Sequence, residues 1–212
     1  MATSTGQRVG IWIIAGAMIV GTLAGFLALI LTPQNEAKDK EQSTAVLEKY
    51  QKDAAEHQKK VDAQTTELSK KYYDAFVKYK DLPAAFDAKS VSKLSTKDLK
   101  VGTGETLTSD TEYSAYYIGW NPKGKVFDQS IDDKTLKTPL PGGNLIEGWN
   151  EGVIGMKIGG VRLISIPSEK AYGEAGSGED IPKNSPIKFV VMVIESPEVI
   201  PQPEIPQELL QQ

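Results

Sequence analysis

The sequence contains no cysteine and only one histidine. Without a thiol there is no disulfide, no thiolate metal ligand and no cysteine nucleophile. His57 lies in a polar stretch with no second ligand in helical register, so a solvated role is favoured over metal binding or catalysis. We therefore predict neither a metal site nor a cofactor.

A basic surplus is also absent, because the net charge is -4 and the isoelectric point is near 5.2. Such a chain has no global positive field, which excludes nucleic acid as an expected partner. No Gly-x-Ser-x-Gly motif is present, which removes most hydrolase mechanisms. The stretch 119–125 has phosphate-loop spacing but lacks the following Ser or Thr, so no nucleotide site is expected.

Charged side chains are missing from residues 11–31. At about 1.5 Å per residue this apolar run covers the roughly 30 Å hydrocarbon core of a bilayer. It exceeds the apolar core of a cleaved signal peptide, which predicts an uncleaved transmembrane helix. Arg8 precedes the run, so we expect residues 1–10 to be cytoplasmic and everything after Pro33 to be extracytoplasmic.

Glycine and proline are absent from residues 36–82, which are rich in Ala, Glu, Lys and Gln. This composition predicts a long helical stalk. One interpretation is a single amphipathic helix that leans on the following domain through its aromatic end; the other is a coiled coil that forms a homodimer. The first depends on Tyr72, Tyr73, Phe76 and Tyr79, the second on the sevenfold row Leu47, Ala54, Val61, Leu68, Ala75 and Leu82.

A linker is expected at 83–96, a domain at 97–196 and a proline-rich extended tail at 197–212. Tyr113, Ala115 and Tyr117 alternate with other residues at the period of a strand. A turn at 121–124 leads to a partner strand, and 161–166 and 187–194 form two further strands. The fold class is therefore α+β: an antiparallel sheet with one short helix, preceded by the transmembrane helix and the stalk.

The short helix is predicted around Trp149. Leu145, Ile146, Trp149 and Val153 share one helix face, while Gly148 and Gly152 make the segment a weak isolated helix. Its surroundings must therefore hold it in place. A wide aromatic ring on such a helix suits the floor of an apolar pocket.

Several motifs occur together in this order: Tyr117-Ile-Gly, Val-Phe127-Asp128, Leu145-Ile-Glu-Gly-Trp149, Ala-Tyr172-Gly, Ile-Pro182 and Ile-Lys-Phe189. In order and spacing this region, from about Asp98 to Ser196, resembles the FKBP family of peptidyl-prolyl isomerases. The resemblance implies a twisted antiparallel sheet wrapped around a short helix, with an apolar pocket between them.

The resemblance also implies the roles of the site residues. Trp149 would form the pocket floor, and the backbone N–H of Ile146 and the hydroxyl of Tyr172 would bind substrate carbonyls. Asp128 would be a buried carboxylate oriented by Tyr117. The predicted catalytic set is Tyr117, Phe127, Asp128, Ile146, Trp149, Tyr172 and Phe189, with Leu136 and Leu145 as further substrate-binding residues.

The resemblance implies isomerisation of X-Pro bonds in polypeptides, with macrolide binding as an associated property. Together with the predicted anchor, it suggests that the substrates are exported proteins that fold on the extracytoplasmic side. One departure is that residues 134–138 carry no Phe where the family has a wall aromatic; Leu136 is the nearest apolar residue. This departure motivates an alternative, a membrane-tethered chaperone or adaptor that binds proline-containing segments with little catalysis. A third interpretation is a spacer assembled through the coiled coil.

Overall fold

The computed structural model describes the backbone of residues 37–207 and the side chains of 44–207. The predicted cytoplasmic segment 1–10 and transmembrane helix 11–31 lie outside the described residues. Within residues 37–207 no helix combines the length and apolar character needed to cross a membrane.

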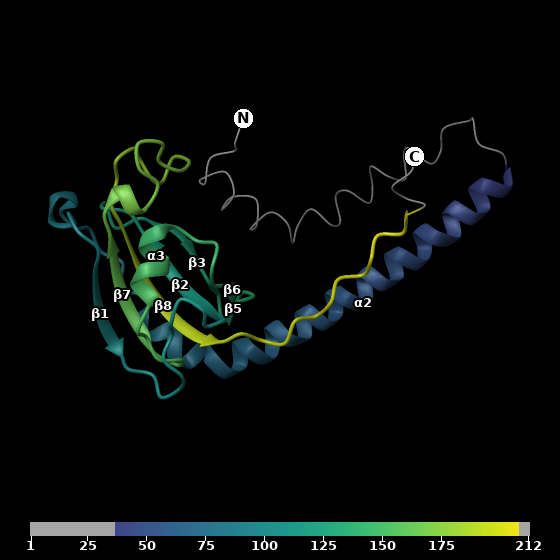
Figure 1. The fold of residues 1–212 in the computed structure, drawn as a ribbon, viewed down its shortest axis with the longest axis horizontal. Helices are drawn as coiled ribbons and strands as arrows, with labels where there is room; N and C mark the ends of the chain where they lie inside the picture. The colour runs from purple at the N-terminus through teal and green to yellow at the C-terminus, as the bar shows by residue number, and fades with distance from the viewer. Residues whose placement is uncertain (1–36, 208–212) are drawn as a thin grey trace. The chain divides into compact units, whose positions relative to one another are not determined.

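The elements follow one another along the chain as Figure 1 shows. They are α2 (Ala37–Phe76), η1 (Val77–Tyr79), η2 (Ala88–Ser90), β1 (Ser95–Lys100), β2 (Tyr113–Trp120), β3 (Val126–Gln129), β4 (Ile131–Asp132), β5 (Thr135–Leu136), β6 (Leu140–Pro141), α3 (Glu147–Val153), β7 (Val161–Ile166), η3 (Ser168–Lys170) and β8 (Ile187–Glu195).

Helix α2 is continuous over 40 residues, as its lack of Gly and Pro predicts. It ends at Phe76, before the predicted end at Leu82, and continues only as the short 3-10 turn η1. One compact unit runs from Gln64 to Glu198. The last turns of α2 therefore belong to this compact unit. The domain bounds expected from the sequence, 97–196, do not include them.

The segments flanking the domain make their own contacts. In the unit that contains residues up to Ala63 and from Val199, His57 Nε2 lies 3.3 Å from the carbonyl oxygen of Ile200. The predicted linker is partly fixed to the domain, because the Trp120 indole donates to Ala84 O at 3.1 Å and Phe86 N donates to Pro122 O at 2.9 Å. As predicted, residues 197–206 of the tail form no helix or strand.

The sheet is antiparallel, with strand order β1-β7-β8-β2-β3 and with β6 paired to β2. The predicted strands at 161–166 and 187–194 are confirmed as β7 and β8. Strand β8 is central and pairs along its length with β7 and β2. Strand β1 is an outer strand, and its side chains are exposed and polar apart from half-buried Leu99.

Both faces of the sheet are covered by hydrophobic clusters. Successive side chains of β2 point to opposite faces, and they belong alternately to one cluster and to the other. Tyr113, Ala115 and Tyr117 face α3 and belong to a cluster with Trp149. Tyr116, Ile118 and Trp120 face the other way, into a cluster that contains Phe76 of α2. The prediction that the aromatic end of the stalk leans on the domain is therefore confirmed: this second cluster also takes in Tyr72, Tyr73 and Tyr79.

The turn between β2 and β3 is built as its residues predict. The side-chain oxygen of Asn121 accepts hydrogen bonds from Lys123 N and Lys125 N at 3.0 and 3.1 Å. Gly124 has a φ of +79°, and a Cβ there would lie 2.7 Å from Ala85 N. Glycine is thus required both by the turn and by the chain that passes over it.

Candidate active site

The indole of Trp149, which is predicted to form the pocket floor, is 2% exposed. Helix α3 places it, and two glycines let α3 approach β7 closely. A Cβ at Gly148 would lie 2.3 Å from Ile166 Cγ2, and one at Gly152 would lie 2.7 Å from Ile164 Cγ2. The glycines that weaken α3 as an isolated helix are therefore what allows it to pack, and β7 holds it in place.

Two polar contacts fix α3 further. The Trp149 indole N–H donates to the hydroxyl of Tyr113 at 3.1 Å, which satisfies its only polar group inside the core. At the other end of the helix, Arg162 Nη1 donates to Gly152 O and Ile154 O at 2.9 and 3.0 Å. The same guanidinium is held by Asp98 of β1, with Nε donating to Oδ1 at 2.6 Å. These contacts orient the ring that forms the floor.

Phe189 of β8 joins the aromatic side chains of the pocket. Its ring centroid lies 5.0 Å from that of Trp149, 5.5 Å from Phe127 and 6.1 Å from Tyr117. Tyr117 lies 5.6 Å from Trp149, and all four pairs meet edge to face. Such pairs are worth about 0.5–1.5 kcal/mol beyond their buried area, so the walls are mutually supporting.

Gly119 makes room for two of these rings. A Cβ at this position would lie 2.4 Å from Phe189 Cε1 and 2.7 Å from the Phe127 ring. Both distances are shorter than side chains tolerate, so any other residue would displace the rings.

The carboxylate of Asp128 is held at the edge of the pocket. It accepts a hydrogen bond from the Tyr117 hydroxyl, and Gln129 N donates to its other oxygen at 2.8 Å. Burial, followed by the bond to Asp128, holds the pKa of Tyr117 well above its usual value of 10.0. Burial, followed by the charge of Asp128, also raises the pKa of Tyr172. Both hydroxyls therefore stay protonated at neutral pH and can act as donors.

Two donors at the pocket have no partner within residues 37–207: the backbone N–H of Ile146 and the hydroxyl of Tyr172. Ile146 is the N-cap residue of α3, where the first N–H groups of a helix have no intrahelical acceptor. Both residues pack in the cluster that contains Trp149. The site thus offers two unused donors beside an apolar floor, as binding of a peptide carbonyl requires.

The structure brings most of the predicted site residues into one place. Ile146, Trp149 and Phe189 are buried in the α3-side cluster. Four others pack against it: Tyr117, Phe127, Leu145 and Tyr172. Asp128 joins them through its hydrogen bond with Tyr117. Their functional roles remain predictions. Asp128 is half-buried rather than fully buried as the resemblance implies.

Leu136 does not join the pocket, which corrects its prediction as a substrate-binding residue. It is 2% exposed and lies in the cluster on the α2 side of the sheet, with Ile131 and Phe76. The reason is that α2 covers the β4–β5 hairpin: Leu136 N donates to Ser69 Oγ at 2.8 Å. The described pocket therefore has no side chain from β5 in its wall.

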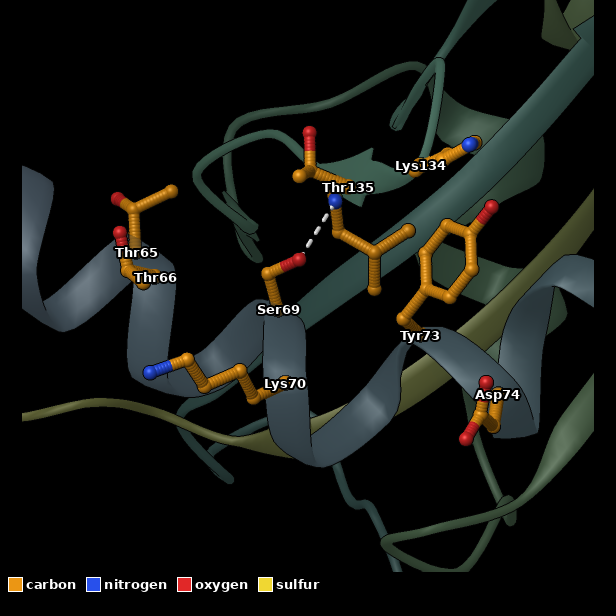
Figure 2. Close-up of a pocket in the computed structure, with 9 residues that line it drawn as sticks. Thr65, Thr66, Ser69, Lys70, Tyr73, Asp74, Lys134 and Thr135 are labelled. Atoms are coloured by element: carbon orange, nitrogen blue, oxygen red, sulfur yellow. Dashed lines mark hydrogen bonds between the residues drawn. The ribbon is translucent and has the colours of Figure 1, made fainter.

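The docking of α2 on this hairpin leaves a groove of about 440 Å³. Figure 2 shows Ser69 pointing across it toward the backbone of Leu136, with Tyr73 and Lys134 at one side. Thr65 and Tyr73 add hydrogen bonds to Thr138 Oγ1 and Asp133 O at 2.9 and 3.1 Å. The hydroxyls of Thr65, Ser69 and Tyr73 are thus used to attach the helix, and the groove is separate from the residues around Trp149.

Sequence reasoning did not assign Tyr113 and Gly119 to the site. Tyr113 carried a usable signal, because it shares the strand period of Tyr117 and so lies on the same face of β2. The role of Gly119 depends on rings from β3 and β8, and nothing in the neighbouring sequence indicates it.

The site contains no pair of nucleophile and base, and within residues 37–207 no group of three or more His, Asp or Glu residues could hold a metal ion. Its elements are a buried aromatic cluster, two free donors and one oriented carboxylate. These suit binding of a polypeptide amide without covalent chemistry.

Comparisons with known proteins agree with this geometry. Residues 103–194 match the family model of FKBP-type peptidyl-prolyl cis-trans isomerases. An FK506-binding protein of Neisseria meningitidis serogroup A is 38% identical over 106 residues, which are 50% of this chain and 97% of that protein. FK506-binding protein 4 of Rhizopus delemar is 39% identical over 98 residues, 46% of this chain. The chain covers only 26% of that larger protein.

Among solved structures, the crystal structure of AtFKBP13 is 34% identical to this chain. The match covers 50% of this chain and 94% of that one, with a TM-score of 0.43. The structure of a peptidyl-prolyl cis-trans isomerase from Pseudomonas syringae is 26% identical and covers 63% of this chain, also with a TM-score of 0.43.

The sheet, the short helix α3 and the aromatic cluster around Trp149 are those of a prolyl isomerase domain. The chain belongs to the FKBP family of peptidyl-prolyl cis-trans isomerases, as its match to nearly the whole Neisseria relative shows.

Proposed function

We propose that this chain accelerates cis-trans isomerisation of X-Pro bonds in polypeptides by binding the twisted amide in the aromatic pocket. The observation that carries the proposal is the pair of unused donors, Ile146 N–H and Tyr172 O–H, beside the buried indole of Trp149. Together they match an amide that presents a carbonyl and a pyrrolidine ring to the same site.

The physical basis requires no proton transfer. An X-Pro bond prefers trans by only about 0.5–1 kcal/mol, but it rotates slowly because amide resonance must be broken at a barrier of about 20 kcal/mol. The twisted amide has lost its charge separation, so a dry apolar pocket favours it over the planar form. Lowering the barrier by about 5 kcal/mol would accelerate rotation several thousandfold.

Each wall residue then has a defined task. Phe127 and Phe189 exclude water from the proline ring, while Ile146 N–H and Tyr172 O–H hold the carbonyls that flank the rotating bond. Asp128, held by the hydroxyl of Tyr117, keeps one wall polar and fixed in orientation. A macrolide that presents carbonyls around an apolar ring system would occupy the same site and inhibit the enzyme.

For the whole chain we propose a single-pass membrane protein with a cytoplasmic N-terminus and an extracytoplasmic domain. This proposal rests on the uncharged run 11–31 and on Arg8 before it. The clients would be exported polypeptides that fold close to the membrane. External protease in intact cells should cut the domain; resistance there, with cleavage after lysis, would show the opposite orientation.

A second candidate function is a tethered binding module with little catalysis. The position of Leu136 favours it, because the pocket gains no wall side chain from β5. An Asp128→Val variant that loses turnover but keeps full biological function would support this alternative.

The experiment is the cis-to-trans rate of a proline peptide with the full chain in detergent, varying the residue before proline. Phe127→Ala removes a pocket wall, and Phe86→Ala, an aromatic on the α2 side of the sheet, is the matched control. We expect clear acceleration that collapses only in the first variant. A folded chain that accelerates no peptide would contradict catalysis and leave the binding module.

A further inference from the structure

The loop that carries Tyr172 has a backbone fold of its own. Gly176 N donates to Tyr172 O at 3.1 Å, and Ser177 and Ile181 exchange two backbone hydrogen bonds. The loop ends at Ile181, which is buried in the same cluster as Trp149. These internal bonds shape the loop but do not set its distance from α3.

The N-terminal end of the loop is attached to α3 by the ammonium group of Lys170. Its Nζ donates to Glu147 Oε1 at 2.8 Å and to Glu151 Oε1 and Oε2 at 2.6 and 2.7 Å. The two carboxylates stand one helical turn apart on α3, and Gly148 lies between them. A Cβ at Gly148 would be 3.2 Å from Lys170 O, so the two segments also meet at backbone distance.

Asp180 attaches the C-terminal end of the loop to the β2–β3 turn. Its carboxylate pairs with Lys125 Nζ, and its backbone carbonyl accepts from Asn121 Nδ2 at 2.8 Å. Asn121 is buried and already organises that turn through its side-chain oxygen. The loop is therefore joined at its two ends to the elements that flank the pocket, α3 and the turn that leads into Phe127.

We propose that Lys170 and Asp180 are positioning residues for the isomerase, which fix the Tyr172 hydroxyl at its distance from the Ile146 N–H. The proposal rests on the proposed function, in which these two donors hold the substrate. Glu147 immediately follows Ile146, and Lys170 lies two residues before Tyr172, so the ion pair connects the two donors by a very short path.

The ion pairs of Lys170 and Asp180 affect the distance between the two donors rather than the free energy of unfolding. Exposed ion pairs contribute little to folding free energy, because water and salt screen them. Displacement of a positioning group by about 1 Å can nevertheless cost up to a hundredfold in rate. The expected signature is therefore a loss of activity in a chain that remains fully folded.

The test uses the full chain in detergent and measures kcat and KM on a proline peptide. Lys170→Met removes the charge and keeps the length of the side chain, and Glu147→Gln with Glu151→Gln removes both partners. We expect each to lower kcat/KM by about five- to twentyfold with an unchanged urea midpoint. Lys170→Met and the double glutamate variant break the same ion pairs from opposite sides. Their combination should therefore lose no more activity than either variant alone.

Two variants complete the design. Lys170→Arg keeps the charge and should retain most of the activity. If Lys170 only filled space, Lys170→Met would retain more activity than Lys170→Arg. Glu169→Gln removes an exposed carboxylate next to Lys170 that forms no ion pair within the described residues, and it should leave kcat/KM unchanged. Wild-type kcat/KM in Lys170→Met, or additive losses in the combination, would overturn the inference.

A second measurement separates this inference from the proposed function. With ¹³C-labelled tyrosine, the ring signal of Tyr172 should shift in Lys170→Met and in Asp180→Asn but not in Glu169→Gln. An inactive wild type would contradict the isomerase while leaving this spectral test intact. An active wild type with an unmoved Tyr172 signal would contradict only the positioning role.

Discussion

The ring of Phe76 at the end of α2 lies 6.2 Å, centroid to centroid, from the ring of Tyr116 in the middle of β2. Both side chains are fully buried, with 0% exposure. A residue of the predicted stalk is thus part of the core on the sheet face opposite the cluster that contains Trp149.

The first prediction concerns this contact. Phe76→Ala should lower the free energy of unfolding by about 3–5 kcal/mol, because it removes a large buried side chain and leaves a cavity. Lys80→Ala, an exposed change just beyond η1, should stay within about 0.5 kcal/mol. Urea unfolding measures both. Equal midpoints would show that α2 is dispensable for the fold.

A second prediction follows for truncated chains. A fragment that starts at Thr96 lacks Phe76 and Tyr72, so it exposes Tyr116, Ile118 and the rest of that apolar face. It should aggregate, whereas a fragment that starts at Gln64 should be monomeric and folded. Size-exclusion chromatography of the two fragments at equal concentration checks this.

Tyr116 provides the third prediction. Its hydroxyl is buried with no hydrogen-bond partner within the described residues. A buried unsatisfied group costs about 1–3 kcal/mol, so Tyr116→Phe should raise the free energy of unfolding by about 1 kcal/mol at neutral pH. A destabilised variant would indicate that the hydroxyl has a partner in solution.

The fourth prediction is a loss of stability at alkaline pH. Burial is the first cause that raises the pKa of Tyr113, Tyr116, Tyr117 and Tyr172 above the usual value of 10.0. Below that value both states are protonated and the stabilisation is complete; above it only the unfolded chain ionises. The unfolding free energy should therefore fall as pH rises past about 10, by up to about 1.4 kcal/mol per pH unit for each such tyrosine.

Tyr116→Phe serves as the control for that slope. It removes one of the tyrosines without touching the pocket, so the fall above pH 10 should be shallower in the variant. Identical slopes in the two proteins would contradict the assignment of a raised pKa to Tyr116.

Gly119 gives the fifth prediction. Gly119→Ala places a methyl group against Phe189 and Phe127, and it should lower kcat/KM at least tenfold while costing about 1–3 kcal/mol of stability. Peptide isomerisation assays and urea unfolding together check it. Unchanged kcat/KM would mean that the two rings can separate without altering the pocket.

Local pattern was enough to predict β2, β7, β8 and the short helix around Trp149, because each follows from hydrophobic periodicity or turn chemistry within a few residues. The long helix was predictable from composition. Its attachment to the sheet was only suggested by the aromatic residues at its end, since whether Phe76 meets Tyr116 depends on tertiary packing.

The site residues were predicted from a resemblance carried by their motifs, and Leu136 shows where that reasoning fails. Position along the chain suggested a pocket wall, but the face on which a side chain lies in a two-residue strand depends on what covers it. Here α2 covers the hairpin, and Ser69 binds its backbone. Likewise, the contact between Lys170 and Glu151 joins separate elements and leaves no pattern in the sequence.

The outer strand β1 has a consequence for the aggregation of the domain. Its backbone groups on the free edge could accept another strand, which is the first step of edge-to-edge aggregation. Lys97, Asp98 and Lys100 place exposed charge along that edge, and the pairing with β7 shifts register between Asp98 and Lys100. The free edge of β1 is therefore a poor template for a further strand, which protects the domain itself from edge-to-edge aggregation.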